Sequence, residues 1–134
     1  MATVLMMDDR PEFLETIGPW LQARGHEVMA STDGMMGVAL ARKVHPAVIV
    51  LDATLPRMDG HDVLVRLKAD PATTHIPVIM LSKAAKDAGC AEAAKGKVGG
   101  HVRHLERAYK PEELLREIEA ALAKHRKAHP TGVR

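Results

Sequence analysis

Residues 47–60 of this 134-residue chain read AVIVLDATLPRMDG. The segment opens with five consecutive aliphatic residues, 47–51, and Asp52 follows them directly. Near-continuous aliphatic runs of this length are typical of strands that are buried on both faces of a parallel sheet. We therefore predict a central strand here, with the Asp52 carboxylate at its carboxyl end.

Four further aliphatic runs are predicted as strands, at residues 3–7, 27–30, 77–81 and, less strongly, 101–106. Segments with the period of an amphipathic helix separate the strands. These helices are expected to begin at Pro11, after Asp33, around Val63, near residue 84 and at Pro111. The alternation predicts an α/β fold, a doubly wound five-stranded parallel sheet with five helices, in which ligands bind beyond the carboxyl ends of the strands.

The composition is that of an ordinary globular domain, with 46% hydrophobic and 27% charged residues. The formal net charge is +2, so the charge balance requires neither a nucleic-acid partner nor an anionic membrane. Cys90 is the only cysteine, which favours a reducing compartment, and we expect a cytoplasmic protein without a membrane-spanning segment. We predict one domain over residues 1–124 and a basic, disordered tail over residues 125–134.

Polar and charged side chains stand where the predicted strands end. Asp8 and Asp9 follow the first strand, Asp52 the third, Ser82 the fourth and Arg107 the fifth. Three carboxylates brought to one edge of a sheet repel one another, and a hard divalent cation such as Mg²⁺, which prefers oxygen ligands, removes that repulsion. The alternative is that Asp8 and Asp9 only cap the first helix. Two adjacent carboxylates exceed what capping needs, so a metal site is favoured.

Asp52 is also a candidate nucleophile. A carboxylate at this position can attack a phosphorus atom and form an acyl phosphate, a reaction that mainly needs positioning and charge neutralisation. Ser82 would then donate a hydrogen bond to the phosphoryl oxygens, although its hydroxyl is equally suited to capping a following helix.

Three segments together resemble the receiver domain of two-component response regulators. They are VLMMDD at residues 4–9, the segment from Val48 to Gly60, and IPVIMLS at residues 76–82, and the likeness covers nearly the whole chain. The resemblance implies a flavodoxin-like strand order of 2-1-3-4-5.

The family's site implies roles for particular residues of this chain. Magnesium would be held by Asp9, Asp52 and the backbone carbonyl of Thr54, with Asp8 acting partly through water. Ser82 would be the switch hydroxyl that responds to phosphorylation.

The resemblance further implies a single-domain response regulator that accepts a phosphoryl group from a sensor histidine kinase or a phosphotransfer protein. Such a chain is a phosphoacceptor with self-catalysed phosphotransfer and autodephosphorylation, and it is not classed as an enzyme. Its output would pass to an unidentified downstream protein through the surface of helix 4, strand 5 and helix 5. We expect a monomer or a weak homodimer that binds neither nucleic acid nor a membrane.

The sequence departs from the family at the end of the fifth strand, where receivers usually have Lys-Pro preceded by an aromatic residue. A gapless match places Arg107 at the lysine, Ala108 at the proline and His104 at the aromatic position. A second register uses Lys110-Pro111 as the Lys-Pro pair, but it leaves almost no connection before the last helix, so Arg107 is favoured. Arginine keeps the positive charge but replaces a compact ammonium with a longer planar fork.

Two other functional classes compete with the phosphoacceptor. A pseudo-receiver, an interaction module independent of phosphate, is favoured by the altered end of the fifth strand. A phosphatase of the haloacid dehalogenase type needs a second aspartate two positions after its nucleophile, where this chain has Thr54.

Overall fold

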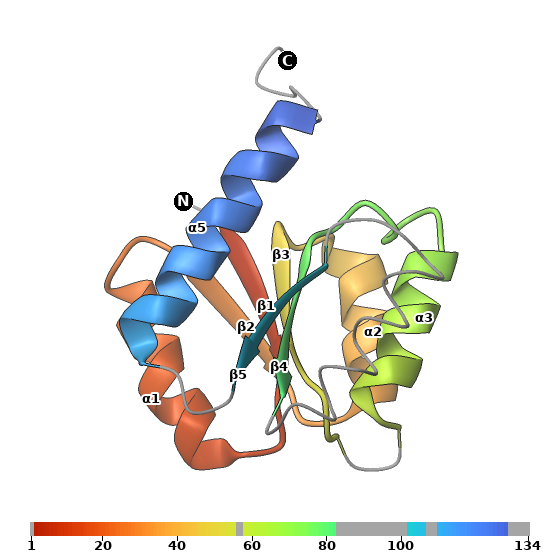
Figure 1. Ribbon diagram of the computed structural model, residues 1–134. Coiled ribbons are helices and arrows are strands. Elements are labelled where there is room, and N and C mark those ends of the chain that lie inside the picture. The colour runs from red at the N-terminus through yellow and green to blue at the C-terminus, as the bar shows by residue number, and fades with distance from the viewer. Residues whose placement is uncertain (1, 56–57, 83–101, 107–109, 129–134) are drawn as a thin grey trace.

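The computed structural model of the chain describes residues 2–55, 58–82, 102–106 and 110–128. Strands and helices alternate along these residues (Figure 1). The strands are β1 (Thr3–Met7), β2 (Glu27–Ser31), β3 (Val48–Asp52), β4 (Val78–Ser82) and β5 (Val102–Glu106). The helices are α1 (Pro11–Gln22), α2 (Gly34–Val44), α3 (Gly60–Ala69) and α5 (Pro111–Ala128).

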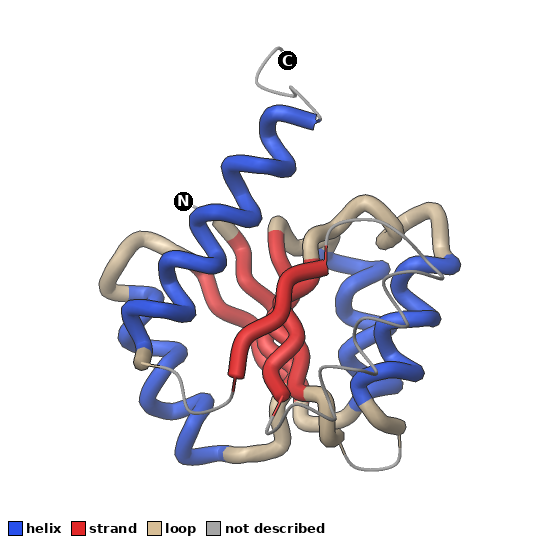
Figure 2. The backbone as a smooth tube through the Cα atoms, in the orientation of Figure 1, coloured by secondary structure: helices blue, strands red, loops and turns tan. Residues whose placement is uncertain are grey.

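The five strands form one parallel sheet in the order β2-β1-β3-β4-β5. Helices α1 and α5 cover one face of the sheet and α2 and α3 cover the other, so the sheet is the middle of three layers (Figure 2). This confirms the predicted α/β fold, its parallel sheet and its strand order. The predicted fourth helix, at residues 84–95, lies outside the described residues.

Two separate hydrophobic clusters fill the space between the layers, because neighbouring residues on a strand point to opposite faces. On β1, Leu5 and Met7 join the cluster beneath α2 and α3, whereas Val4 and Met6 join the cluster beneath α1 and α5. The aliphatic run of β3 divides in the same way, and each of its residues is at most 1% exposed. The aliphatic runs of β1 and β3 therefore mark strands with two buried faces, as predicted, whereas the edge strand β2 is partly exposed.

Local signals in the sequence mark the helix ends. Pro11 opens α1, and Gly25, with a φ of 92°, adopts the left-handed conformation just beyond its end. Asp33 is the N-cap of α2 and accepts a hydrogen bond from the Met35 N–H over 2.8 Å. The positions of Pro11 and Asp33 were predicted from residue type alone.

Helix α5 continues to Ala128 and projects past the sheet toward the C-terminus (Figure 1). The helix thus runs four residues beyond position 124, where we predicted the domain to end, and residues 129–134 lie outside the described part of the chain. The boundary between domain and tail stays a prediction. Of the helices that the structure describes, none combines the length and apolar character needed to cross a membrane.

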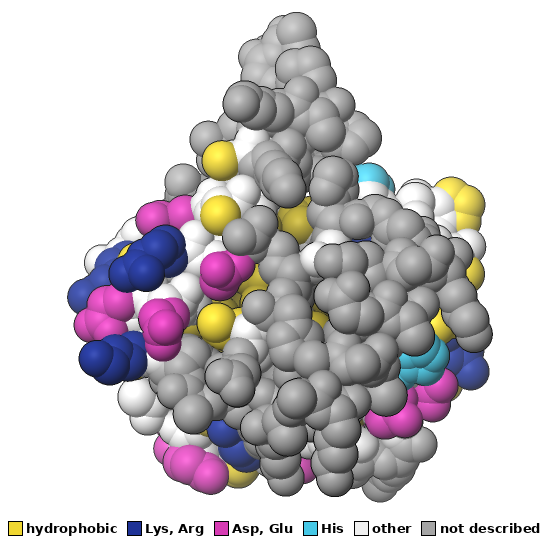
Figure 3. All heavy atoms as spheres, viewed as in Figure 1, with side chains coloured by type: hydrophobic (Ala, Val, Ile, Leu, Met, Phe, Trp, Pro, Cys, Tyr) yellow, Lys and Arg dark blue, Asp and Glu magenta, His cyan; other side chains and the backbone are white. Residues whose placement is uncertain are grey.

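Both charge signs occur on the surface over α1 and α5. In the space-filling view, Lys and Arg side chains lie next to Asp and Glu side chains on this part of the molecule (Figure 3). This mixture fits the formal net charge of +2.

Candidate functional site

Three carboxylates gather at the carboxyl ends of β1 and β3. Each of Asp8, Asp9 and Asp52 offers one oxygen atom, and these atoms all lie within 4.8 Å of one another. The sheet brings them together because β1 and β3 are neighbours, with Met7 paired to Leu51. Asp8 and Asp52 are each only 1% exposed, whereas Asp9 is open to solvent. The predicted convergence of the three carboxylates is confirmed, whereas the placement of the Ser82 hydroxyl and of Arg107 at the same edge stays a prediction.

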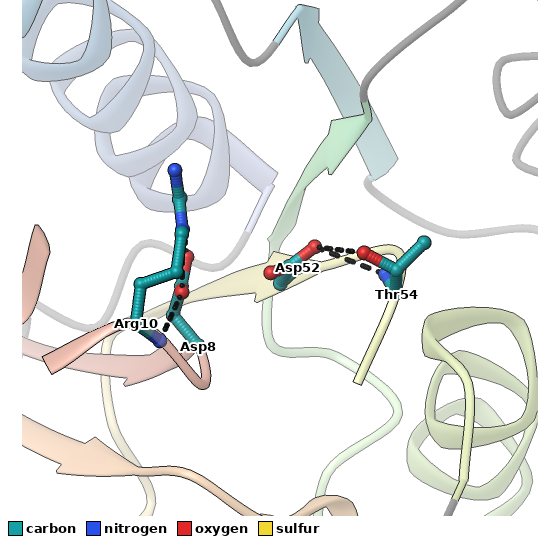
Figure 4. A network of polar contacts seen from close by, with 4 residues as sticks. All are labelled: Asp8, Arg10, Asp52 and Thr54. Atoms are coloured by element: carbon teal, nitrogen blue, oxygen red, sulfur yellow. Dashed lines mark hydrogen bonds and ion pairs between the residues drawn. The ribbon is translucent and has the colours of Figure 1, made fainter. Parts of the chain in front are cut away.

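The Asp52 carboxylate is held in one orientation by the loop that follows β3. Its Oδ1 accepts hydrogen bonds from the Thr54 N–H over 3.0 Å and from the Thr54 hydroxyl over 3.2 Å (Figure 4). The sequence indicated a role for the Thr54 backbone only, so the hydroxyl contact is a new element of the site. A side chain whose rotamer is fixed in this way is ready for reaction without reorganisation.

The same loop is anchored to the sheet and to α3. The Ala53 N–H donates to the Leu81 carbonyl over 2.8 Å, and the Gly60 N–H donates to the Ala53 carbonyl over 2.9 Å. A Cβ atom at Gly60 would lie 2.6 Å from the Ala53 Cα and 2.7 Å from the Asp52 carbonyl oxygen. Glycine is therefore required at the start of α3 for the loop to pass this close to Asp52.

Asp8 is bound by an arginine that the sequence did not single out. Arg10 Nε lies 2.9 Å from Asp8 Oδ1, and Arg10 Nη2 lies 2.6 Å from Asp8 Oδ2 (Figure 4). The Arg10 backbone N–H also donates to Asp8 Oδ1, over 2.9 Å. This planar fork is the strong, charge-assisted geometry of arginine on a carboxylate. The sequence signal for this contact is the position of Arg10, two residues after the aspartate that follows the first strand.

The alternative in which Asp8 and Asp9 serve as helix caps is not supported. The N-cap of α1 is Arg10, and it makes no side-chain capping bond within the described part of the chain. The hydrogen bonds of the Asp8 carboxylate go to Arg10. Three clustered carboxylates, two of them buried, instead fit a hard divalent cation, since Mg²⁺ prefers oxygen ligands. Asp8, Asp9 and Asp52 thus form a cation site of the magnesium type.

The structure describes the remaining predicted site residues only in part. Ser82 is the last residue of β4, one position beyond Leu81, which pairs with Asp52. The Ser82 and His104 side chains and the whole of Arg107 and Ala108 lie outside the described residues. Lys110 stands just before α5, and its backbone N–H donates to Glu113 Oε1 over 2.7 Å. The choice between Arg107 and Lys110 as the site cation stays a prediction.

Comparison with known proteins agrees with the fold and the site. Residues 4–119 match the family described as response regulator receiver domain. The chain is 32% identical to protein PilH of Pseudomonas aeruginosa over 123 residues, which cover 92% of this chain and 99% of PilH. It is also 33% identical to RpaA of Synechocystis, a DNA-binding transcriptional regulator, over 122 residues. The aligned residues cover 91% of this chain but only 49% of RpaA.

A solved structure shows the same architecture. The chemotaxis protein CheY4 of Vibrio cholerae superimposes with a TM-score of 0.80 at 27% identity, covering 91% of this chain and 99% of CheY4. The chain therefore belongs to the response regulator receiver domain family, whose members are phosphoacceptors rather than classical enzymes, as the sequence motifs predicted.

Proposed function

We propose that this chain is a single-domain response regulator that accepts a phosphoryl group on Asp52 in a magnesium-dependent reaction and signals by protein contact. The observation that carries the proposal is the buried Asp52 carboxylate, fixed by Thr54 and grouped with Asp8 and Asp9 at the carboxyl edge of the sheet. The chain matches PilH along nearly the full length of that protein, and this match supports the single-domain form.

In the proposed reaction a carboxylate oxygen of Asp52 attacks the phosphorus atom of the donor. A new P–O bond forms, and the bond from phosphorus to the donor's leaving group breaks, which leaves an acyl phosphate on Asp52. The two Thr54 donors orient the carboxylate before the attack by their hydrogen bonds to Oδ1. Bound magnesium would neutralise the negative charge that collects as a phosphoryl group approaches three carboxylates.

Each further residue of the proposed site has a specific task. Asp9, Asp52 and the Thr54 backbone carbonyl would hold the metal, with Asp8 contributing partly through water. Arg107 or Lys110 would supply a cation to the phosphoryl oxygens, and Ser82, at the end of the neighbouring strand β4, would donate a hydrogen bond to them.

Receiver domains take their phosphoryl group from histidine kinases, so we propose a sensor histidine kinase or a phosphotransfer protein as the donor. Phosphorylation would shift an existing equilibrium between two conformations. The altered surface would be that of the predicted fourth helix, β5 and α5, where an as yet unidentified downstream protein would bind.

The test is phosphorylation of the purified protein by a small-molecule phosphodonor, with and without magnesium, followed by intact mass measurement. We expect one added phosphoryl group that requires magnesium and is absent from Asp52→Asn. The matched control is Asp59→Asn, because Asp59 is an exposed N-cap in the same β3–α3 connection and asparagine caps equally well. Labelling that survives in Asp52→Asn would refute the assignment of Asp52.

A pseudo-receiver is the second candidate, and the sequence around the end of β5 favours it, because the preferred register puts Arg107-Ala108 where the family usually has Lys-Pro. Such a protein would bind its partner equally well as wild type and as Asp52→Asn, with or without a phosphodonor. Binding that depends on both Asp52 and the phosphodonor excludes this function.

A further inference from the structure

Arg10 sets this acidic site apart from a simple cluster of carboxylates. Both side-chain oxygens of Asp8 are engaged by the guanidinium group, at 2.9 and 2.6 Å, and Oδ1 also accepts the Arg10 backbone N–H. A carboxylate offers about four lone-pair positions, and the three bonds from Arg10 use most of them. The Asp8 side chain is 1% exposed, so these bonds replace the water that burial removes.

The charge balance gives this contact a function beyond local stability. Asp8, Asp9 and Asp52 place three formal negative charges within a few ångströms of one another, and Arg10 contributes one positive charge to the same cluster. A cation entering the cluster meets both that positive charge and a carboxylate most of whose lone-pair positions already accept hydrogen bonds from Arg10. Binding of the metal and the Arg10–Asp8 contact therefore oppose each other.

Arg10 also contacts Phe13 while it is bound to Asp8. Its side chain is 28% exposed, and its guanidinium carbon lies 4.2 Å from the centre of the Phe13 ring, one turn along α1. Stacking on an aromatic ring stabilises a guanidinium group without a carboxylate partner. The guanidinium group is therefore held by the Phe13 ring as well as by Asp8, and the ring contact does not involve the carboxylate.

We propose that Arg10 is an internal counter-ion of the metal site, a positioning residue that holds Asp8 when the metal is absent and is displaced from it when Mg²⁺ binds. The inference rests on the proposed function, since it takes Mg²⁺ as the cation of this site. Its consequence is that Arg10 lowers the affinity for Mg²⁺ and keeps the acidic cluster compact and folded at low metal concentration.

The proposal is tested by the Mg²⁺ affinity of the purified protein, measured by calorimetry without any phosphodonor. Arg10→Gln is expected to bind Mg²⁺ about tenfold more tightly than wild type, since charge-assisted bonds to Asp8 no longer compete. Arg10→Lys keeps the charge but loses the fork, so its affinity should fall between the two.

Arg24→Gln is the matched control. Arg24 also stacks on an aromatic residue, at 3.7 Å from the Trp20 ring, and carries the same charge, but it lies beyond the opposite end of α1. Its removal should leave Mg²⁺ affinity unchanged.

A double-mutant comparison tests whether the effect of Arg10 passes through Asp8. In an Asp8→Asn background the gain in Mg²⁺ affinity from Arg10→Gln should shrink to less than about threefold, because the competing contact is lost.

A second readout uses the wild-type protein and does not depend on how the variants fold. The NMR signal of the Arg10 Nε–H should move as Mg²⁺ is added, because the hydrogen bond to Asp8 Oδ1 is released. Affinity in Arg10→Gln equal to or weaker than wild type, an Arg10 signal unchanged at saturating Mg²⁺, or the absence of Mg²⁺ binding in both proteins would each overturn the proposal. Failure of Asp52 to accept a phosphoryl group would leave both readouts, the Mg²⁺ affinity and the Arg10 signal, unaffected.

Discussion

Lys68 is a buried lysine, 6% exposed, near the end of α3. Its Nζ donates to the Ile76 carbonyl over 2.7 Å and to the Thr74 carbonyl over 3.0 Å, so the side chain fastens the connection between α3 and β4. Burial lowers the pKa of Lys68 from its ordinary value of 10.5 to about 8. A neutral amine still has two N–H groups, and it therefore keeps both bonds to the carbonyls.

The lowered pKa makes the stability of the protein depend on pH in a definite direction. Between about pH 8 and pH 10.5 the Lys68 amine is neutral in the folded state and still protonated in the unfolded state. The unfolded state then binds more protons, so raising the pH through this range stabilises the folded state. The size of the effect is about 1–3 kcal/mol, the upper end corresponding to the full change in pKa.

The assay is urea unfolding of wild type and of Lys68→Met across this pH range. The free energy of unfolding of wild type should rise relative to Lys68→Met by about 1–3 kcal/mol between pH 8 and pH 10.5. Taking the difference between the two proteins cancels the titration of groups that they share. Lys43→Met, which changes an exposed lysine on α2, should run parallel to wild type. A wild-type and Lys68→Met difference that stays constant over this range would refute the reasoning.

Two further predictions concern the loops that position the site. Gly60→Ala should destabilise the protein by about 1–3 kcal/mol, because the new Cβ would collide with the backbone of Asp52 and Ala53. It should also slow phosphorylation of Asp52 roughly ten- to a hundredfold by displacing the carboxylate, measured as the rate of phosphodonor labelling. Asp33→Ala removes the N-cap bond to Met35 and should cost about 1 kcal/mol in urea unfolding, while labelling of Asp52 persists. Loss of labelling in Asp33→Ala would contradict the expectation that the N-cap of α2 does not affect phosphorylation of Asp52.

The sequence predicts the sheet closely because the decisive pattern is local. The run from residue 47 to 51 was expected as a strand and the structure has β3 at Val48–Asp52, and β1 coincides with its prediction at both ends. Strands buried on both faces need only an unbroken aliphatic run, which is visible without knowledge of their neighbours. The convergence of Asp8, Asp9 and Asp52 follows in turn from the common direction of parallel strands.

The contacts of Lys68 were not predictable in the same way. Lysine on a helix is usually exposed, and nothing in the sequence around Lys68 distinguishes it from a solvated residue. Its burial depends on two carbonyl groups, of Thr74 and Ile76, that the turn after α3 aims at it. The position of these acceptor carbonyls depends on the conformation of the loop after α3. That conformation cannot be read from the hydrophobic periodicity that identifies strands and helices.

Arg10 shows why the charge of a site is harder to predict than its location. Strand ends place the three carboxylates, and their residue type indicates a cation, so the sequence suggests that a metal must balance the whole charge. The structure has a further cation, supplied by Arg10, the N-cap residue that lies between the end of β1 and the start of α1. Because this connection brings Arg10 onto the carboxylate two residues before it, part of the negative charge is balanced within the chain. The affinity for Mg²⁺ is then a difference between two competing partners of Asp8, and a count of acidic ligands alone overestimates it.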